Sequence, residues 1–143
     1  MTKLFEKVLI ASDGSERNQP AVREAVEIAR ACGSVLHVVY VIDESAFTSA
    51  PTDVLPEDLY LNMQEEGEKA VGQVKQMAEG VQVETRVLSG KPARVITDFA
   101  TRNGVDLIVV GSLGKTGLSR LLLGSTAEAI IRTAGCGVLV VKG

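Results

Sequence analysis

The sequence DLIVVGSLGKTGLSRLLLGSTAEAIIRTA, residues 106–134, contains the pattern that decides the fold. Its apolar run at 107–110 is rich in β-branched residues, which is typical of a strand that is buried on both faces. A glycine-rich segment follows from Gly111, and a helical pattern begins at Gly124-Ser125. This succession predicts an anion site, because glycine lets the backbone approach a phosphate and the first turn of a helix carries unpaired N–H groups.

The predicted helix start also has the spacing of a capping box. Ser125 is followed by Glu128 at the third position after it. In a capping box, the hydroxyl and the carboxylate accept hydrogen bonds from free amides of the first turn. We therefore expect Ser125 and Glu128 to cap a helix that runs to about Ala134.

Two common phosphate motifs do not fit this loop. Gly114-Lys115-Thr116 looks like the end of a Walker A loop, but the first glycine of that motif would stand at position 109, which is valine. The dinucleotide fingerprint G-x-G-x-x-G has no match here either. The pattern that does fit is G-x2-G-x9-G-[ST], formed by Gly111, Gly114, Gly124 and Ser125.

Strand and helix patterns alternate along the rest of the chain. Apolar runs predict the strands, and apolar residues at helical spacing predict the helices between them. We expect strands at 7–12, 35–42, 81–87, 107–110 and 138–141; helices from a cap at Ser15 or Asn18 to about Cys32, at about 57–79, from Pro92 to Gly104 and at about 125–134; and the longest loop at 43–56. Polar and apolar residues alternate at 81–87, which is typical of an edge strand with one wet face.

Five alternations with short connections predict a doubly wound α/β fold, in which a parallel sheet has helices on both faces. In such sheets, ligands bind in the crevice at the carboxyl ends of two neighbouring strands that the chain leaves in opposite directions. The periodicity alone does not define the strand order.

Length and composition agree with this fold and exclude several classes of function. The chain has 143 residues, which we expect to form one domain over 1–143, and 45% of them are hydrophobic. A net charge of −3 without a basic patch argues against nucleic-acid binding. No apolar run reaches the roughly 18 residues that cross a bilayer, and the start has no signal-peptide pattern. Cys32 and Cys136 lack metal spacing, so we expect buried thiols in a reducing cytoplasm.

The glycine pattern, placed after a fourth strand and before the last helix, resembles that of the universal stress protein family in its ATP-binding branch. The resemblance covers nearly the whole chain. It implies a five-stranded parallel sheet in the order 3-2-1-4-5, in which Asp13 and Gly111 both lie at the crevice. One departure is Cys136-Gly137-Val138, where related chains usually read Cys-Pro-Val. This departure makes the turn before the last strand more flexible and leaves the nucleotide loop unaffected.

The resemblance also implies a role for each residue of the crevice. The ligand would be ATP or a related adenine nucleotide, with Ala11 lining the base pocket and the backbone of Val41 at the adenine edge. Asp13 would accept hydrogen bonds from ribose hydroxyls or from the adenine amino group; without the resemblance, a turn former in Asp-Gly-Ser is the preferred interpretation. Gly111 would lie under the ribose, and the phosphates would rest on Gly114, Gly124, Ser125 and Thr126.

Other polar residues have weaker claims on the site. Lys115 or Arg120 could neutralise phosphate charge, but solvated surface residues of a glycine-rich loop are about as common. No carboxylate cluster indicates a metal held by the protein, so Mg²⁺ would be carried mainly by the phosphate oxygens. His37 lies inside an apolar run, and we interpret it as a packed core histidine.

The function that these patterns favour is a nucleotide-dependent stress-response or signalling module. Efficient hydrolysis needs a group that orients water, and the loop itself has no Asp, Glu, Gln or His. We therefore predict no catalytic residues, with a slow ATPase as the alternative. An adaptor that binds no nucleotide is the third possibility.

The end of the chain predicts an assembly. Residues 138–141 are all apolar, and the implied strand order puts them at a sheet margin, where unpaired N–H and C=O groups invite another strand. The resemblance implies a homodimer through residues 138–142. The alternative is a monomer whose last strand frays or is shielded by the last helix.

Overall fold

The computed structural model describes residues 4–45, 56–112 and 123–142. The predicted doubly wound α/β fold is confirmed, with five parallel strands in the order β3-β2-β1-β4-β5. In chain order the elements are β1 (Lys7–Ala11), the 3-10 turn η1 (Glu16–Asn18), α1 (Gln19–Cys32), β2 (Val35–Asp43), α3 (Pro56–Met77), β3 (Gln82–Gly90), α4 (Pro92–Asn103), β4 (Leu107–Gly111), α5 (Ser125–Thr133) and β5 (Gly137–Val141).

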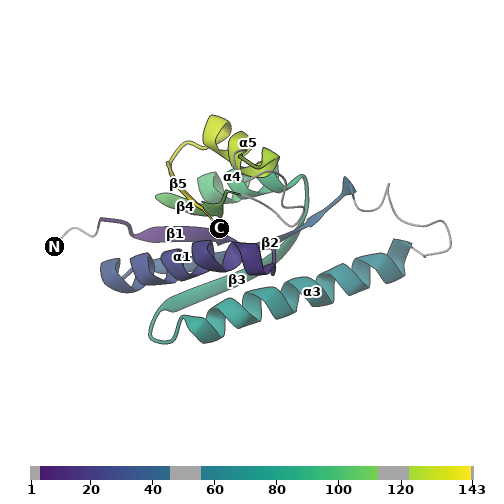
Figure 1. The fold of residues 1–143 in the computed structure, drawn as a ribbon, viewed down its shortest axis with the longest axis horizontal. Helices are drawn as coiled ribbons and strands as arrows, with labels where there is room; N and C mark the ends of the chain where they lie inside the picture. The colour runs from purple at the N-terminus through teal and green to yellow at the C-terminus, as the bar shows by residue number, and fades with distance from the viewer. Residues whose placement is uncertain (1–3, 46–55, 113–122, 143) are drawn as a thin grey trace.

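The helices form two layers, one on each face of the sheet (Figure 1). Helices α1 and α3 lie on one face, and α4 and α5 lie on the other. Successive residues of a strand point to opposite faces, so β1 contributes to both cores: Val8 and Ile10 pack toward α1, whereas Leu9 packs toward α4 and α5. All three are fully buried, as expected for a strand near the middle of a parallel sheet.

The edge position of β3 is confirmed by its pairing and its exposure. It pairs with β2 in the described sheet, and Gln82, Glu84 and Arg86 are exposed. The strand extends to Gly90, beyond the predicted end at residue 87, because its last three residues still pair with β2.

His37 is a core histidine, as predicted. Its ring packs edge to face on Phe99, with the ring centroids 5.4 Å apart, and its Nδ1 lies 3.3 Å from Glu84 Oε2. Burial lowers the pKa of His37, an effect that the Glu84 carboxylate opposes. His37 is therefore neutral at pH 7.

Two predictions about burial are wrong. The apolar spacing in the helix predicted at about 57–79 puts Met77 on its inner face, but Met77 is 39% exposed, because the helix ends at this residue and the turn that follows leads away to β3. Cys32 and Cys136 were expected to be buried, and both are half-buried instead. Each lies next to a turn, Cys32 at the last residue of α1 and Cys136 just before β5. In the described part of the chain, no helix has the length and apolarity that a membrane span needs.

Two glycines of α3 give a matched test of the packing between this helix and the sheet. A Cβ on Gly67 would lie 2.8 Å from Tyr40 Cδ1 and 2.8 Å from Val87 Cγ1, whereas a Cβ on Gly72 would have no neighbour within 4 Å. Alanine raises helix propensity at both positions by roughly 1 kcal/mol. Only Gly67→Ala overpacks the core, so it should be less stable than Gly72→Ala by about 1–3 kcal/mol. Urea unfolding of the two variants measures the difference; equal midpoints would show that α3 does not approach β2 and β3 this closely.

Candidate functional site

The predicted crevice lies at the carboxyl ends of β1 and β4, where the described sheet has its switch point. The two strands pair side by side, with Ile10 opposite Val109. Beyond this pair the chain leaves β1 toward α1 on one face and leaves β4 toward α5 on the other (Figure 1). Asp13 follows the end of β1, Gly111 ends β4, and the turn η1 contacts β4. The structure therefore brings together the two segments that the sequence separates by about a hundred residues.

The Asp13 side chain shapes the turn that follows β1. Its Oδ1 accepts hydrogen bonds from the Ser15 backbone N–H at 2.9 Å and from Ser15 Oγ at 2.6 Å. Gly14 between them has φ 77°, a left-handed conformation that favours glycine. Within the described residues, Asp13 Oδ2 accepts no hydrogen bond. One carboxylate oxygen thus forms the turn, and the other has no donor among the described residues.

Neither predicted cap of α1 forms. Asn18 occupies the N-cap position but makes no capping hydrogen bond, and Ser15, which precedes η1, makes none either. Asn18 is 4% exposed, and its side chain bonds the segment that ends β1 instead. Its Nδ2 donates to the Ala11 carbonyl at 3.3 Å, and its Oδ1 accepts from the Asp13 N–H at 3.4 Å. Sequence pattern does not reveal this role, because an Asn before a helix usually indicates a cap.

On the other side of the crevice, the chain returns to the place where it left β4. Gly111 pairs with Val141, and the Ser112 N–H donates to the Val141 carbonyl at 2.9 Å. The Gly124 N–H then donates to the Ser112 carbonyl at 2.7 Å. This bond holds the beginning of α5 against the end of β4.

The predicted capping box does not form. Gly124 is the N-cap of α5 and makes no side-chain cap, so Ser125 is already the first helical residue. The Glu128 carboxylate pairs with Arg132 at 2.6 Å, one turn further along the exposed side of the helix. The first bond within α5 runs from the Glu128 N–H to the Gly124 carbonyl at 3.0 Å.

This start leaves three amides of α5 without a partner among the described residues: those of Ser125, Thr126 and Ala127. Together with the helix dipole they attract an anion. The Gly124 amide, in contrast, is already bonded to Ser112. Gly124 has φ −62° and ψ 151°, which any residue can adopt, so a side chain at this position would bring no backbone strain. Gly114, Lys115 and Arg120 lie outside the described residues.

Ala11 and Val41 lie on the α4–α5 side of the sheet. Both are half-buried and pack against the core cluster beneath those helices. Val41 pairs with Leu88 near the carboxyl end of β2, one strand away from Asp13. A flat apolar group could lie along the half-exposed ends of β1 and β2. Among the described residues, no group of three His, Cys, Asp or Glu side chains is placed to hold a metal ion.

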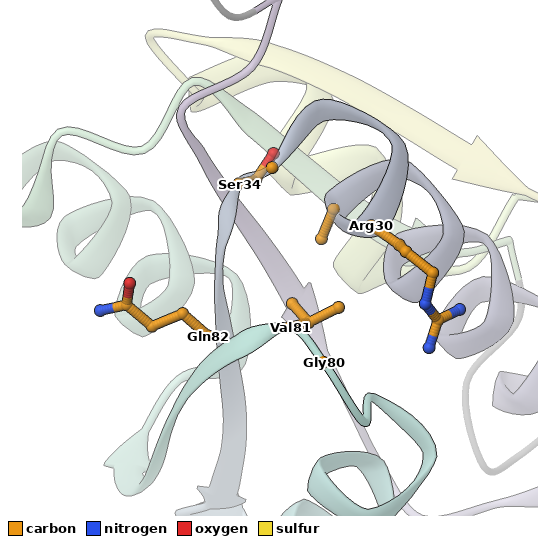
Figure 2. Close-up of a pocket in the computed structure, with 7 residues that line it drawn as sticks. Arg30, Ser34, Gly80, Val81 and Gln82 are labelled. Carbon is orange, nitrogen blue, oxygen red and sulfur yellow. The ribbon is translucent and has the colours of Figure 1, made fainter.

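A hollow of about 220 Å³ lies at the opposite edge of the sheet, near the amino ends of β2 and β3 (Figure 2). Two of its polar side chains bond within the protein: Arg30 Nη2 donates to the Glu79 carbonyl at 3.2 Å, and Ser34 Oγ donates to the Phe5 carbonyl at 2.6 Å. This hollow is separate from the crevice.

A doubly wound sheet, with an aspartate turn after β1 and with helix amides after β4 that have no partner among the described residues, defines the class of α/β proteins whose ligands bind at the topological switch point of the sheet. Residues 4–142 match the sequence model of the universal stress protein family, and the chain belongs to this family. The resemblance deduced from the glycine pattern is thereby confirmed.

Similarity to individual proteins extends over nearly the whole length of the chain. Universal stress protein MJ0531 of Methanocaldococcus jannaschii is 43% identical over 141 residues, covering 97% of this chain and 83% of that protein. The solved structure of the hypothetical protein MJ0577 superposes with a TM-score of 0.86 at 30% identity, covering 98% of this chain and 97% of that chain.

Two further solved structures with this fold contain adenine nucleotides. A universal stress protein in complex with cAMP has a TM-score of 0.68 at 24% identity and covers 99% of this chain and 98% of its own. The universal stress protein from Archaeoglobus fulgidus in complex with dAMP has a TM-score of 0.64 at 24% identity and covers 97% of this chain and 98% of its own.

Proposed function

We propose that this protein binds ATP, or a related adenine nucleotide, at the β1–β4 crevice and acts as a nucleotide-dependent stress-response or signalling module. The observation that carries the proposal is the open start of α5. The amides of Ser125 and Thr126 have no partner among the described residues and lie beside the end of β4. Phosphate oxygens would satisfy them and would gain from the helix dipole. Gly114 and Lys115, from the same glycine pattern, would complete the phosphate site.

The other side of the crevice supports an adenosine moiety. Asp13 Oδ2, which accepts no hydrogen bond from the described residues, can accept one from a ribose hydroxyl or from the adenine amino group. Ala11 and the Val41 backbone would contact the base, and Gly111 would pass under the ribose. The family includes proteins that bind cAMP and dAMP, and this supports an adenine base. Mg²⁺ would be carried by the phosphates, because carboxylate ligands for it do not cluster in the described residues.

In this proposal ATP is a ligand rather than a rapidly consumed substrate. Hydrolysis needs a group that orients the attacking water. Glu128 is the acid nearest to the loop in sequence, and its carboxylate pairs with Arg132 at 2.6 Å. The slow ATPase therefore remains the weaker alternative. The cytoplasmic location and the homodimer through residues 138–142 are part of the same proposal.

Mass spectrometry of the nucleotide released from freshly purified, denatured protein tests the identity of the ligand. We expect an adenine nucleotide, because Asp13, Ala11 and Val41 together suit an adenosine. An Asp13→Ala variant purified in parallel should retain less of it, since it lacks the acceptor for the ribose or the base. A co-purifying ligand without adenine, held equally by both proteins, would contradict the assignment. A wild-type protein that retains nothing and takes up no added ATP would favour the adaptor that binds no nucleotide.

A further inference from the structure

The turn after β1 contains a buried side chain that the proposed function has not used. Asn18 is 4% exposed, and its amide makes two hydrogen bonds, both to the backbone of the segment that ends β1. The two bonds, to the Ala11 carbonyl and from the Asp13 N–H, are 3.3 and 3.4 Å long. Each is weak by its length. They matter because both bonds are partly buried, and a polar group left unbonded out of reach of water is costly.

The arrangement of these two bonds imitates a parallel β-ladder. In a parallel ladder, one residue of the neighbouring strand donates to the residue before its partner and accepts from the residue after it. The Asn18 side chain makes the same two bonds around Ser12: its Nδ2 donates to the Ala11 carbonyl, and its Oδ1 accepts from the Asp13 N–H. The Ser12 N–H itself donates to Val39 of β2 at 2.9 Å. Because backbone groups alternate in direction along a strand, the Ala11 carbonyl and the Asp13 N–H face the β4 side.

Asn18 therefore makes the two hydrogen bonds to β1 that β4 would make if the ladder continued. The last β1–β4 pair is Ile10 with Val109, and in an unbroken ladder the partner of Ser12 would be Gly111. The two strands part before that pair forms, because the chain leaves them toward opposite faces. A side-chain amide carries one donor and one acceptor group, as a peptide group does, so it can close the gap.

We propose that Asn18 is a positioning residue for the nucleotide site: it extends the β1 ladder where β1 and β4 part, and so holds Asp13 in place for the ligand. This inference rests on the proposed function. Ser15 completes the arrangement, because its N–H and Oγ hold Asp13 Oδ1 at 2.9 and 2.6 Å. Asn18 thus fixes the backbone of Asp13, and Ser15 fixes one carboxylate oxygen. The other oxygen is presented in a defined position, which reduces the ordering that binding would otherwise require.

The first part of the test is hydrogen exchange and does not depend on any ligand. In Asn18→Ala the Asp13 amide should exchange at least about tenfold faster than in the wild type, since it loses its acceptor. The Ser12 amide, which is bonded to Val39, should keep its protection in the same protein. An unchanged exchange rate at Asp13 would overturn the proposal. If Asn18→Ala fails to fold, Asn18→Leu fills the same space without an amide, and the same expectation holds.

The second part is a double-mutant cycle on the dissociation constant for ATP, measured by calorimetry. Asn18→Ala should weaken binding roughly fivefold to tenfold in the wild type, and should have less than about a twofold effect when Asp13→Ala is already present. Ser34→Ala is the control, because Ser34 is also a buried polar residue but bonds Phe5 at the far edge of the sheet. It should lower stability and leave ATP affinity unchanged.

The outcomes separate this inference from the function on which it rests. If wild-type protein binds ATP and the Asn18→Ala loss is as large in the Asp13→Ala background as in the wild type, Asn18 acts on the whole site and the positioning role is wrong, while the proposed function stands. If folded wild-type protein binds no ATP, the proposed function fails, and the positioning role fails with it.

Discussion

Replacement of Gly124 by valine should weaken ATP binding more than tenfold, a loss above about 1.4 kcal/mol, and should leave the fold intact. Gly124 is the N-cap of α5, next to the amides of Ser125 and Thr126, which have no partner among the described residues. Its φ of −62° and ψ of 151° suit any residue, so valine adds no backbone strain. The expected loss therefore comes from the isopropyl group itself, which would occupy space that the phosphates need.

Calorimetric titration of the folded variant with ATP measures this loss. Gly135→Val is a suitable control, because Gly135 lies in the exposed turn after α5, and a Cβ there would meet nothing within 4 Å. It should bind ATP as the wild type does. If Gly124→Val, shown to be folded by its circular dichroism, binds ATP with unchanged affinity, the phosphates do not lie at the start of α5.

Replacement of Val140 by proline should convert the proposed homodimer to a monomer without removing a hydrogen bond from the sheet. The Val141 carbonyl accepts from Ser112, so the backbone groups of Val141 face β4. Backbone groups alternate along a strand, so the N–H of Val140 faces the open edge of β5. Proline removes this donor, which antiparallel pairing with a second copy of β5 would use. Proline is tolerated at such outward-facing positions of edge strands.

The exposure of β5 supports a partner at this edge. Residues Val138–Val141 are apolar and only half-buried, and the described sheet ends at this strand. Val140→Thr is the control, since threonine keeps the N–H and the branched shape; it should remain dimeric. Light scattering at tens of micromolar distinguishes the two variants. A wild-type mass near the monomer value of 15.1 kDa would overturn the dimer.

Much of the fold could be predicted because apolar periodicity follows directly from burial. The runs that form β1, β2 and β4 are buried on both faces, and the alternation at Gln82, Glu84 and Arg86 identified the edge strand correctly. The strand order could not be predicted from periodicity, and it came from the family resemblance. Contacts such as that of the Asp106 carboxylate with the amides of Glu6 and Lys7 link residues about a hundred positions apart, and local pattern does not report them.

The site was harder to predict, because capping residues have more than one possible partner. Ser125 and Glu128 have the spacing of a capping box, yet the helix starts one residue earlier and Glu128 pairs with Arg132. The difference matters for function, because a formed box would have occupied first-turn amides that a phosphate could bind. Asn18 also looked like a cap, and only the divergence of β1 and β4 explains why its amide bonds β1 instead.

Calorimetric titration of the purified wild-type protein with ATP in the presence of Mg²⁺ tests most directly whether the β1–β4 crevice binds an adenine nucleotide. We predict a saturable heat with about one nucleotide per chain, and we expect the affinity to fall for GTP, because Asp13, Ala11 and Val41 form the side of the crevice that would contact the base. Absence of saturable binding by folded protein at millimolar ATP would contradict the account.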